Sequence, residues 1–230
     1  MEDKIIFLHI PKTAGTSLRN LIEQEYSSSQ CLPVYQPWPY QPAVLAEMKA
    51  KLPAAKILYG HLLFGLHQQL NIEAQYVTFL RDPIERVISF FNHNAYHPNS
   101  EYHKAIQNGL SLLKLLKSER APQANNLMTR MLAPYQPNDL LDDERVFEQA
   151  LENIDKHFCM VGLMEKFAES VDLLGKKLGW QSSPEIPHLN VVSNKHIQEV
   201  DAQTQAALEK YNRLDMLLYE HVSRNFSATV

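Results

Sequence analysis

The segment from Lys4 to Tyr26 limits the possible folds of this chain more than any other part of the sequence. It begins with Lys4-Ile-Ile-Phe-Leu-His-Ile10, a continuous apolar run that is typical of a strand buried on both faces of a parallel sheet. The polar loop Pro11-Lys-Thr-Ala-Gly-Thr-Ser17 follows, and apolar residues then recur at helical spacing from about Thr16. A buried strand, a short loop and an amphipathic helix predict a P-loop-like unit of an α/β protein.

The alternation of strands and helices continues along the chain. We expect further strands at 56–60, 76–80 and 157–163, and helices at 43–52, from 82, at 165–178 and over 201–225. Several short helices are predicted within 100–155. No linker divides the chain, so the pattern predicts one domain over residues 1–230. Its expected architecture is a three-layer α/β fold with a central, mostly parallel sheet of four to five strands and extra helices in the middle and at the C-terminus.

The stretch Ser27–Pro42 interrupts this alternation. It holds prolines at 33, 37, 39 and 42, so we expect no regular structure there. Its aromatic residues Tyr35, Trp38 and Tyr40 either serve a functional loop or pack onto the surface of the domain.

The helix after the strand at 76–80 has a clear start signal. Asp82 is a good N-cap and Pro83 suits the first helical turn. Glu85 completes the pattern of a capping box, in which its side chain would accept from the Asp82 backbone N–H.

Composition excludes several classes of protein. The net charge of −4 disfavours a nucleic-acid partner, which a basic surface would attract. Two cysteines, Cys31 and Cys159, are too few for a disulfide framework and are expected to be free thiols. The N-terminus shows no secretory signal and no apolar run reaches the ~20 residues that cross a bilayer. We therefore expect a cytoplasmic protein without a transmembrane segment; an oligomer is compatible with the sequence.

The loop at 11–17 is suited to binding an anion. The first N–H groups of the following helix lack intrahelical partners, and the helix dipole favours negative charge there. Gly15 would let the backbone approach a ligand, hydroxyls of Thr13, Thr16 and Ser17 could donate, and Lys12 adds a positive charge. The order differs from a Walker A loop, because lysine comes first and only one glycine is present.

Two motifs carry a resemblance to a known family. His9-Ile-Pro-Lys-Thr-Ala-Gly-Thr-Ser17 resembles the 5′-phosphosulfate loop of the sulfotransferases that use PAPS (3′-phosphoadenosine 5′-phosphosulfate), in the carbohydrate branch that includes heparan sulfate and uronyl 2-O-sulfotransferases. Phe79–Phe91 resembles that family's second signature, in which Arg81 and Ser89 match the residues that hold the 3′-phosphate. Val161–Phe167 is similar to a further family segment.

This resemblance implies a ligand for each motif. PAPS would be the co-substrate and no metal would be required. The 5′-phosphosulfate is expected at Pro11, Lys12, Thr13, Ala14, Gly15, Thr16 and Ser17. Arg81 alone would more simply form a structural ion pair, but a guanidinium can also grip a phosphate with two hydrogen bonds.

Transfer of a sulfuryl group to an alcohol needs a base and a group that stabilises the leaving oxygen. Lys12 is placed for the leaving oxygen. His61 follows the strand at 56–60, where ligands of open α/β sheets bind, and Gly60-His61 resembles the segment that carries the base in the 2-O-sulfotransferase branch. A loop histidine without a catalytic role is the alternative for His61. His9 is a spare candidate, but its place in the buried strand favours a core role.

Other polar residues carry weaker signals. His93 and His97 have the spacing of metal ligands, but no third ligand is evident, so we expect a solvated helix face and no metal. Arg130, in Asn126–Arg130, resembles a residue that borders the acceptor cleft; it would bind an anionic substrate or lie on the surface. The acidic group at 139–144 is expected to cap a helix, and the loop at 190–195 to cover the nucleotide.

Together these features predict a sulfotransferase that moves a sulfuryl group from PAPS to a hydroxyl by in-line displacement. The acceptor would be a sugar, a glycan, a glycoconjugate or another small molecule. Two alternatives remain open: a nucleotide-dependent kinase, and a nucleotide-binding protein without catalysis. ATP lacks a 3′-phosphate, so binding of adenosine 3′,5′-bisphosphate against ATP-Mg²⁺ separates a sulfotransferase from a kinase.

Overall fold

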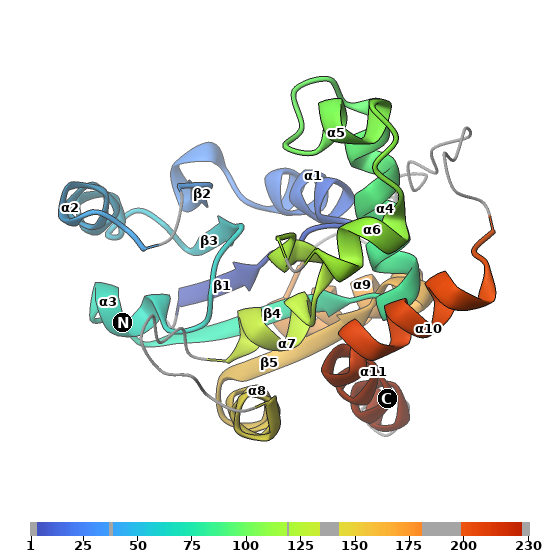
Figure 1. Ribbon diagram of the computed structural model, residues 1–230. Coiled ribbons are helices and arrows are strands. Elements are labelled where there is room, and N and C mark those ends of the chain that lie inside the picture. The colour runs from blue at the N-terminus through green and yellow to red at the C-terminus, as the bar shows by residue number, and fades with distance from the viewer. Residues whose placement is uncertain (1–3, 37–38, 119, 134–142, 181–198, 227–230) are drawn as a thin grey trace.

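The fold is built around a parallel five-stranded sheet with the order β2-β3-β1-β4-β5 (Figure 1). The computed structural model describes residues 4–36, 39–118, 120–133, 143–180 and 199–226. All four pairs of neighbouring strands are parallel. The strands are β1 (Lys4–Leu8), β2 (Cys31–Val34), β3 (Ile57–Gly60), β4 (Ala74–Leu80) and β5 (Phe158–Leu163). The predicted α/β class and its parallel sheet are confirmed.

Helices cover both faces of the sheet. The described helices are α1 (Gly15–Glu25), α2 (Pro42–Lys51), α3 (Leu66–Leu70), α4 (Pro83–Tyr96), α5 (His103–Gln107), α6 (Leu112–Lys117), α7 (Leu127–Leu132), α8 (Asp143–His157), α9 (Phe167–Leu178), α10 (Ala202–Tyr211) and α11 (Arg213–Phe226). Short 3₁₀ turns are η1 (Ser28–Gln30), η2 (Pro122–Ala124) and η3 (Met164–Lys166). The predicted short helices between residues 100 and 155 are confirmed.

The apolar run of β1 explains the three layers. Ile6 and Leu8 point into a core shared with α2, α3, α7, α8 and α11. Phe7 points to the opposite face and packs with residues of α1 and α9. Burial of each such side chain contributes about 1.5–3 kcal/mol, so a strand that is apolar on both sides is stable only between two helical layers. A third apolar cluster joins α4, α5, α6, α10 and η2 on the side toward which the strands point (Figure 1).

The prediction of no regular structure at Ser27–Pro42 is wrong, because β2 lies within it. The structure pairs β2 with β3 only, so it is an edge strand. Pro33 is exposed there and lacks a backbone N–H, which an edge strand tolerates because one of its sides has no partner. The sheet thus gains an edge strand that proline content alone argued against.

The predicted single helix over 201–225 is two helices, α10 and α11, separated at Asn212. Asn212 is buried and its amide group donates to the carbonyls of Ala124 and Leu208, while its side-chain oxygen accepts from the N–H of Asn126. The break lets α10 pack on the third cluster while α11 packs on the sheet. A straight helix would serve only one of these surfaces.

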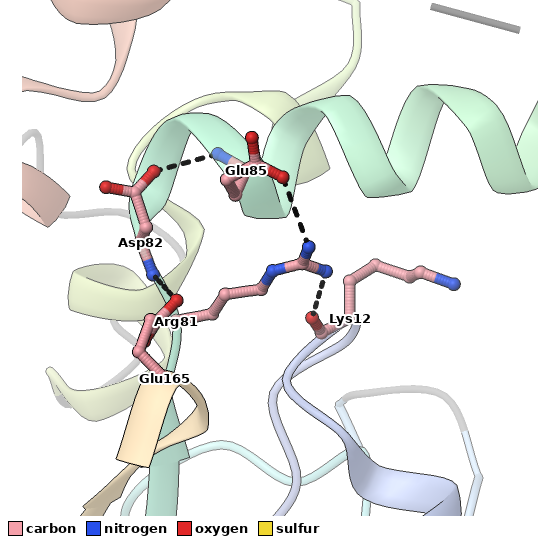
Figure 2. A network of polar contacts seen from close by, with 5 residues as sticks. All are labelled: Lys12, Arg81, Asp82, Glu85 and Glu165. Carbon is pink, nitrogen blue, oxygen red and sulfur yellow. Dashed lines mark hydrogen bonds and ion pairs between the residues drawn. The ribbon is translucent and has the colours of Figure 1, made fainter. Parts of the chain in front are cut away.

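The start of α4 confirms the predicted N-cap and corrects the capping box. Asp82 accepts from the N–H of Glu85 at 2.9 Å, and Pro83 is in the first turn. The N–H of Asp82 donates to Glu165 at 2.8 Å, so Glu85 does not perform that role (Figure 2). Glu85 pairs with Arg81 instead. The acceptor for the Asp82 N–H is therefore Glu165, in the turn η3 between β5 and α9.

Gly179 ends α9 in the left-handed conformation. Cys31 and Cys159 are both free. Asp143 and Glu144 occupy the first turn of α8, while the rest of the acidic group lies outside the described residues, as does the loop at 190–195. Within the described parts of the chain, no helix has both the length and the apolar composition to cross a membrane.

Candidate functional site

The carboxyl ends of four parallel strands bring polar and aromatic residues to one edge of the sheet. His9 follows β1, Tyr35 follows β2, His61 follows β3 and Arg81 follows β4. This edge is where open α/β sheets bind their ligands. The register explains why three of them meet: Gly60 pairs with Leu8 on one side and with Val34 on the other, so the next residues of these three strands are neighbours.

His61 lies beside two aromatic rings, and part of its side chain is exposed. Its ring centroid lies 4.7 Å from that of His9 and 5.4 Å from that of Tyr35. The segment needs Gly60, because a Cβ at that position would lie 1.8 Å from the carbonyl oxygen of Val34. Burial lowers the pKa of His61, so its imidazole is neutral and able to accept a proton at neutral pH.

His9 does not have the core role favoured by the sequence. Its ring stacks on Phe7 and faces His61 at the sheet edge. Burial lowers the pKa of His9 to about 3, with the neighbouring His61 and Lys12 as lesser causes. Two adjacent imidazoles and a lysine disfavour added positive charge, so His9 is neutral under ordinary conditions.

The glycine of the loop has a structural role besides the one predicted. Gly15 is the first residue of α1, and a Cβ there would lie 1.6 Å from Nε2 of His9. The missing side chain therefore makes room for the His9 imidazole. Approach of a ligand to the loop backbone stays a prediction.

The loop backbone is held in an unusual conformation. Lys12 has φ 74° and Ala14 has φ 64°, values that cost a non-glycine residue about 1–2 kcal/mol each. Between them, the buried hydroxyl of Thr13 donates to the carbonyl of Ile10 at 2.8 Å. That hydroxyl is thus engaged inside the loop, and what Thr13 can offer an anion is its backbone N–H. Alternating left-handed residues form concave arrays of N–H groups that suit anions.

The N-terminus of α1 opens onto this loop. Ala14 is its N-cap and supplies no side-chain hydrogen bond, and no acidic residue stands in the first turn. Thr16 is exposed and Ser17 is buried. Uncapped N–H groups at the positive end of a helix dipole favour an anion at this place.

Arg81 joins the loop to α4. Its Nη1 donates to the carbonyl of Lys12 at 3.4 Å and its Nη2 pairs with Glu85 at 3.4 Å (Figure 2). The side chain of Lys12 extends away from this guanidinium (Figure 2). Burial lowers the pKa of Lys12, and the charge of Arg81 lowers it further. The charges of the two side chains act on each other, so an anion in this region would be favoured by both.

One face of α4 adjoins this loop and its cations. Ser89 and His93 follow Glu85 at intervals of four residues, so they share a face of the helix, and both are partly buried. Burial lowers the pKa of His93 to about 4, with Lys12 and then His97 as further causes. The predicted solvated face is therefore met only in part at His93, while His97 is exposed. Its ring lies 4.0 Å from that of His97, and no group of three or more potential metal ligands occurs among the described residues.

Arg130 lies on α7, and its guanidinium donates to the carbonyl of Pro122. This contact ties it to η2, and its binding of a substrate stays a prediction. No sequence pattern singled out Arg86, which is wholly buried. The guanidinium of Arg86 donates to the carbonyl of Gln123 at 2.9 Å. Burial lowers the pKa of Arg86 to about 10, and the negative charge of Asp215 acts in the opposite direction. Arg86 anchors α4 to η2.

A family model described as "Sulfotransferase family" matches residues 1–221. Galactose-3-O-sulfotransferase 3 of Bos taurus is 27% identical over 248 residues, covering 96% of this chain and 56% of the relative. Galactose-3-O-sulfotransferase 2 of Mus musculus is 23% identical over 248 residues, covering 96% of this chain and 61% of the relative. The chain thus spans somewhat more than half the length of these curated relatives.

Among solved structures, a sulfotransferase from Alicyclobacillus acidocaldarius matches with a TM-score of 0.56. The identity is 15%, and the match covers 100% of this chain and 99% of the other. At this identity the likeness concerns the fold alone.

Proposed function

Because the chain belongs to the Sulfotransferase family, we propose that it transfers a sulfuryl group from PAPS to a hydroxyl of a sugar. The observation that carries the proposal is the meeting, at one sheet edge, of an uncapped helix N-terminus, two neighbouring cations and a neutral imidazole. The first two suit a doubly phosphorylated donor, and the third suits removal of a proton from an alcohol.

The donor would lie along the loop and the first turns of α4. The N–H groups at the start of α1 and the amine of Lys12 would hold the 5′-phosphosulfate. Arg81 and Ser89 would hold the 3′-phosphate. The two 3.4 Å contacts of Arg81 are long for charge-assisted hydrogen bonds, so a phosphate would compete well for this guanidinium.

The chemistry is a displacement at sulfur. The acceptor oxygen forms a bond to sulfur, the bond from sulfur to the 5′-phosphate oxygen breaks, and adenosine 3′,5′-bisphosphate leaves. His61 would take the proton of the acceptor hydroxyl, and Lys12 would stabilise the charge that grows on the leaving oxygen. The depressed pKa of Lys12 makes that amine a better proton donor to the leaving group than an ordinary lysine.

The acceptor is proposed from the relatives. Both are named as galactose-3-O-sulfotransferases, so a galactoside is the first acceptor to test. No nucleic-acid partner and no metal are included in the proposal.

A calorimetric titration tests the donor. Adenosine 3′,5′-bisphosphate should bind more tightly than ATP-Mg²⁺; the reverse order would contradict the proposal and favour a kinase. This measurement needs no acceptor.

A transfer assay with radiolabelled PAPS and β-galactosides tests the catalysis. His61→Ala should lose about 100-fold or more in turnover while it retains affinity for adenosine 3′,5′-bisphosphate. His221→Ala is the matched control, because His221 is exposed on α11 and should leave turnover unchanged. Unchanged turnover in His61→Ala would remove His61 from the mechanism.

A further inference from the structure

Tyr35 stands out at the site because its ring is open to solvent. With 46% of its surface exposed, it is the most exposed of the large apolar side chains among the described residues. It follows directly after β2, at the same sheet edge as the candidate base. A single exposed aromatic residue is ordinary on a protein surface, so its setting decides whether it has a role.

The setting places Tyr35 beside His61. Val34 and Gly60 are paired in the sheet, so Tyr35 and His61 leave adjacent strands side by side. Their ring centroids are 5.4 Å apart and the rings are nearly perpendicular, at 82°. Close approach of the two strands depends on the glycine at 60, as described above.

Neighbouring residues hold the Tyr35 ring in place. Tyr59 packs against it edge to face, with centroids 6.5 Å apart. The hydroxyl of Tyr59 donates to Glu23 at 2.6 Å, and Glu23 also pairs with Arg19 at 2.8 Å. Arg19 also lies near the Tyr35 hydroxyl: burial raises the pKa of that hydroxyl, and the charge of Arg19 opposes the rise. These neighbours restrict the ring, which lowers the entropy lost when a ligand binds.

We propose that Tyr35 is the platform of the acceptor subsite, on which the C–H face of a pyranose ring stacks while one ring hydroxyl reaches His61. The inference rests on the proposed function and deepens it by naming the recognition element for a cyclic sugar. The apolar C–H face of a pyranose complements an exposed aromatic ring, whereas the hydroxyl edge of the sugar complements a polar rim. Arg19 and Glu23 supply that rim.

Specificity follows from this arrangement. An open-chain alcohol lacks the face that a pyranose offers to Tyr35, so it should be a poorer acceptor at the same concentration. Donor binding lies on α1 and α4, so removal of the Tyr35 ring should leave the affinity for adenosine 3′,5′-bisphosphate unchanged.

Acceptor kinetics with methyl β-galactoside test the inference. Tyr35→Leu keeps an apolar side chain without a ring and should raise the acceptor KM about tenfold, with kcat within about twofold of the unmodified protein. Tyr35→Phe retains the ring and should behave like the unmodified protein. Leu217→Ala, which removes another exposed apolar side chain on α11, is the control for non-specific effects. An acceptor KM of Tyr35→Leu within twofold of the unmodified value would overturn the inference.

A binding measurement separates this inference from the proposed function. Saturation-transfer NMR with methyl β-galactoside, in the presence of adenosine 3′,5′-bisphosphate, needs no turnover. Sugar-ring signals that are present with the unmodified protein and lost with Tyr35→Leu support the platform; equal signals, or none with either protein, overturn it. Absence of transfer despite a Tyr35-dependent signal would count against the proposed function alone.

Discussion

The fit between Gly15 and His9 gives the sharpest prediction from this structure. A Cβ at position 15 would lie 1.6 Å from Nε2 of His9, which is about the length of a covalent bond. Gly15 lies in helical backbone without a positive φ, so Gly15→Ala would by itself stabilise the helix by about 0.5–1 kcal/mol. The collision with His9 opposes this gain.

The collision should dominate. The imidazole is packed between Phe7, His61 and the start of α1, so it must leave a favourable rotamer or push the helix. Overpacking of this kind costs about 1–3 kcal/mol. For a chain of this size we expect Gly15→Ala to lower Tm by about 2–10 °C. Because displacement of His9 also disturbs His61, turnover should fall as well.

Urea unfolding of a double-mutant cycle measures the effect. His9→Ala removes the ring that the new methyl group would strike, so Gly15→Ala should be neutral or stabilising in that background. The coupling between the two substitutions should be about 1–3 kcal/mol. Equal stability changes for Gly15→Ala in the presence and absence of His9 would refute the reasoning, as would a Gly15→Ala protein more stable than the unmodified one.

Two further predictions concern charge. Arg81→Ala should weaken binding of adenosine 3′,5′-bisphosphate about 10–100-fold. Glu85→Gln should strengthen that binding, because it removes the ion pair that engages Arg81. A titration in which Glu85→Gln binds the nucleotide more weakly would contradict this. The second prediction concerns pH. Because the pKa of His9 is lowered to about 3, its imidazole is protonated in the unfolded chain but not in the folded chain over this range. The free energy of unfolding should therefore fall by about 1.4 kcal/mol per pH unit as pH drops from about 6.5 toward 3. Urea unfolding of His9→Asn should show a shallower dependence over that range, and an unchanged slope would exclude His9 as a cause.

Sequence patterns predicted those features of this protein that depend on residues close together in the chain. The β1 run, the loop after it and the amphipathic face of α1 are set by residue order, and each was predicted correctly in type. Asp82 and Pro83 specify the start of α4 because an N-cap needs only the next three residues. The place of a loop between β1 and α1, and of His61 at the end of a strand, could likewise be inferred from the sequence.

Tertiary structure decided what depends on distant partners. Pro33 lies in a strand because the sheet leaves one side of β2 unpaired, and Asn212 breaks a helix because residues of η2 and α7 engage its side chain. His9 leaves the core because strand register brings it to His61, and Gly15 then has to make room for it. The sequence by itself therefore determined the strand, loop and helix of β1 and α1 and the start of α4, since those preferences act over a few residues. Only packing between segments far apart in the chain decided which side chains meet at the sheet edge.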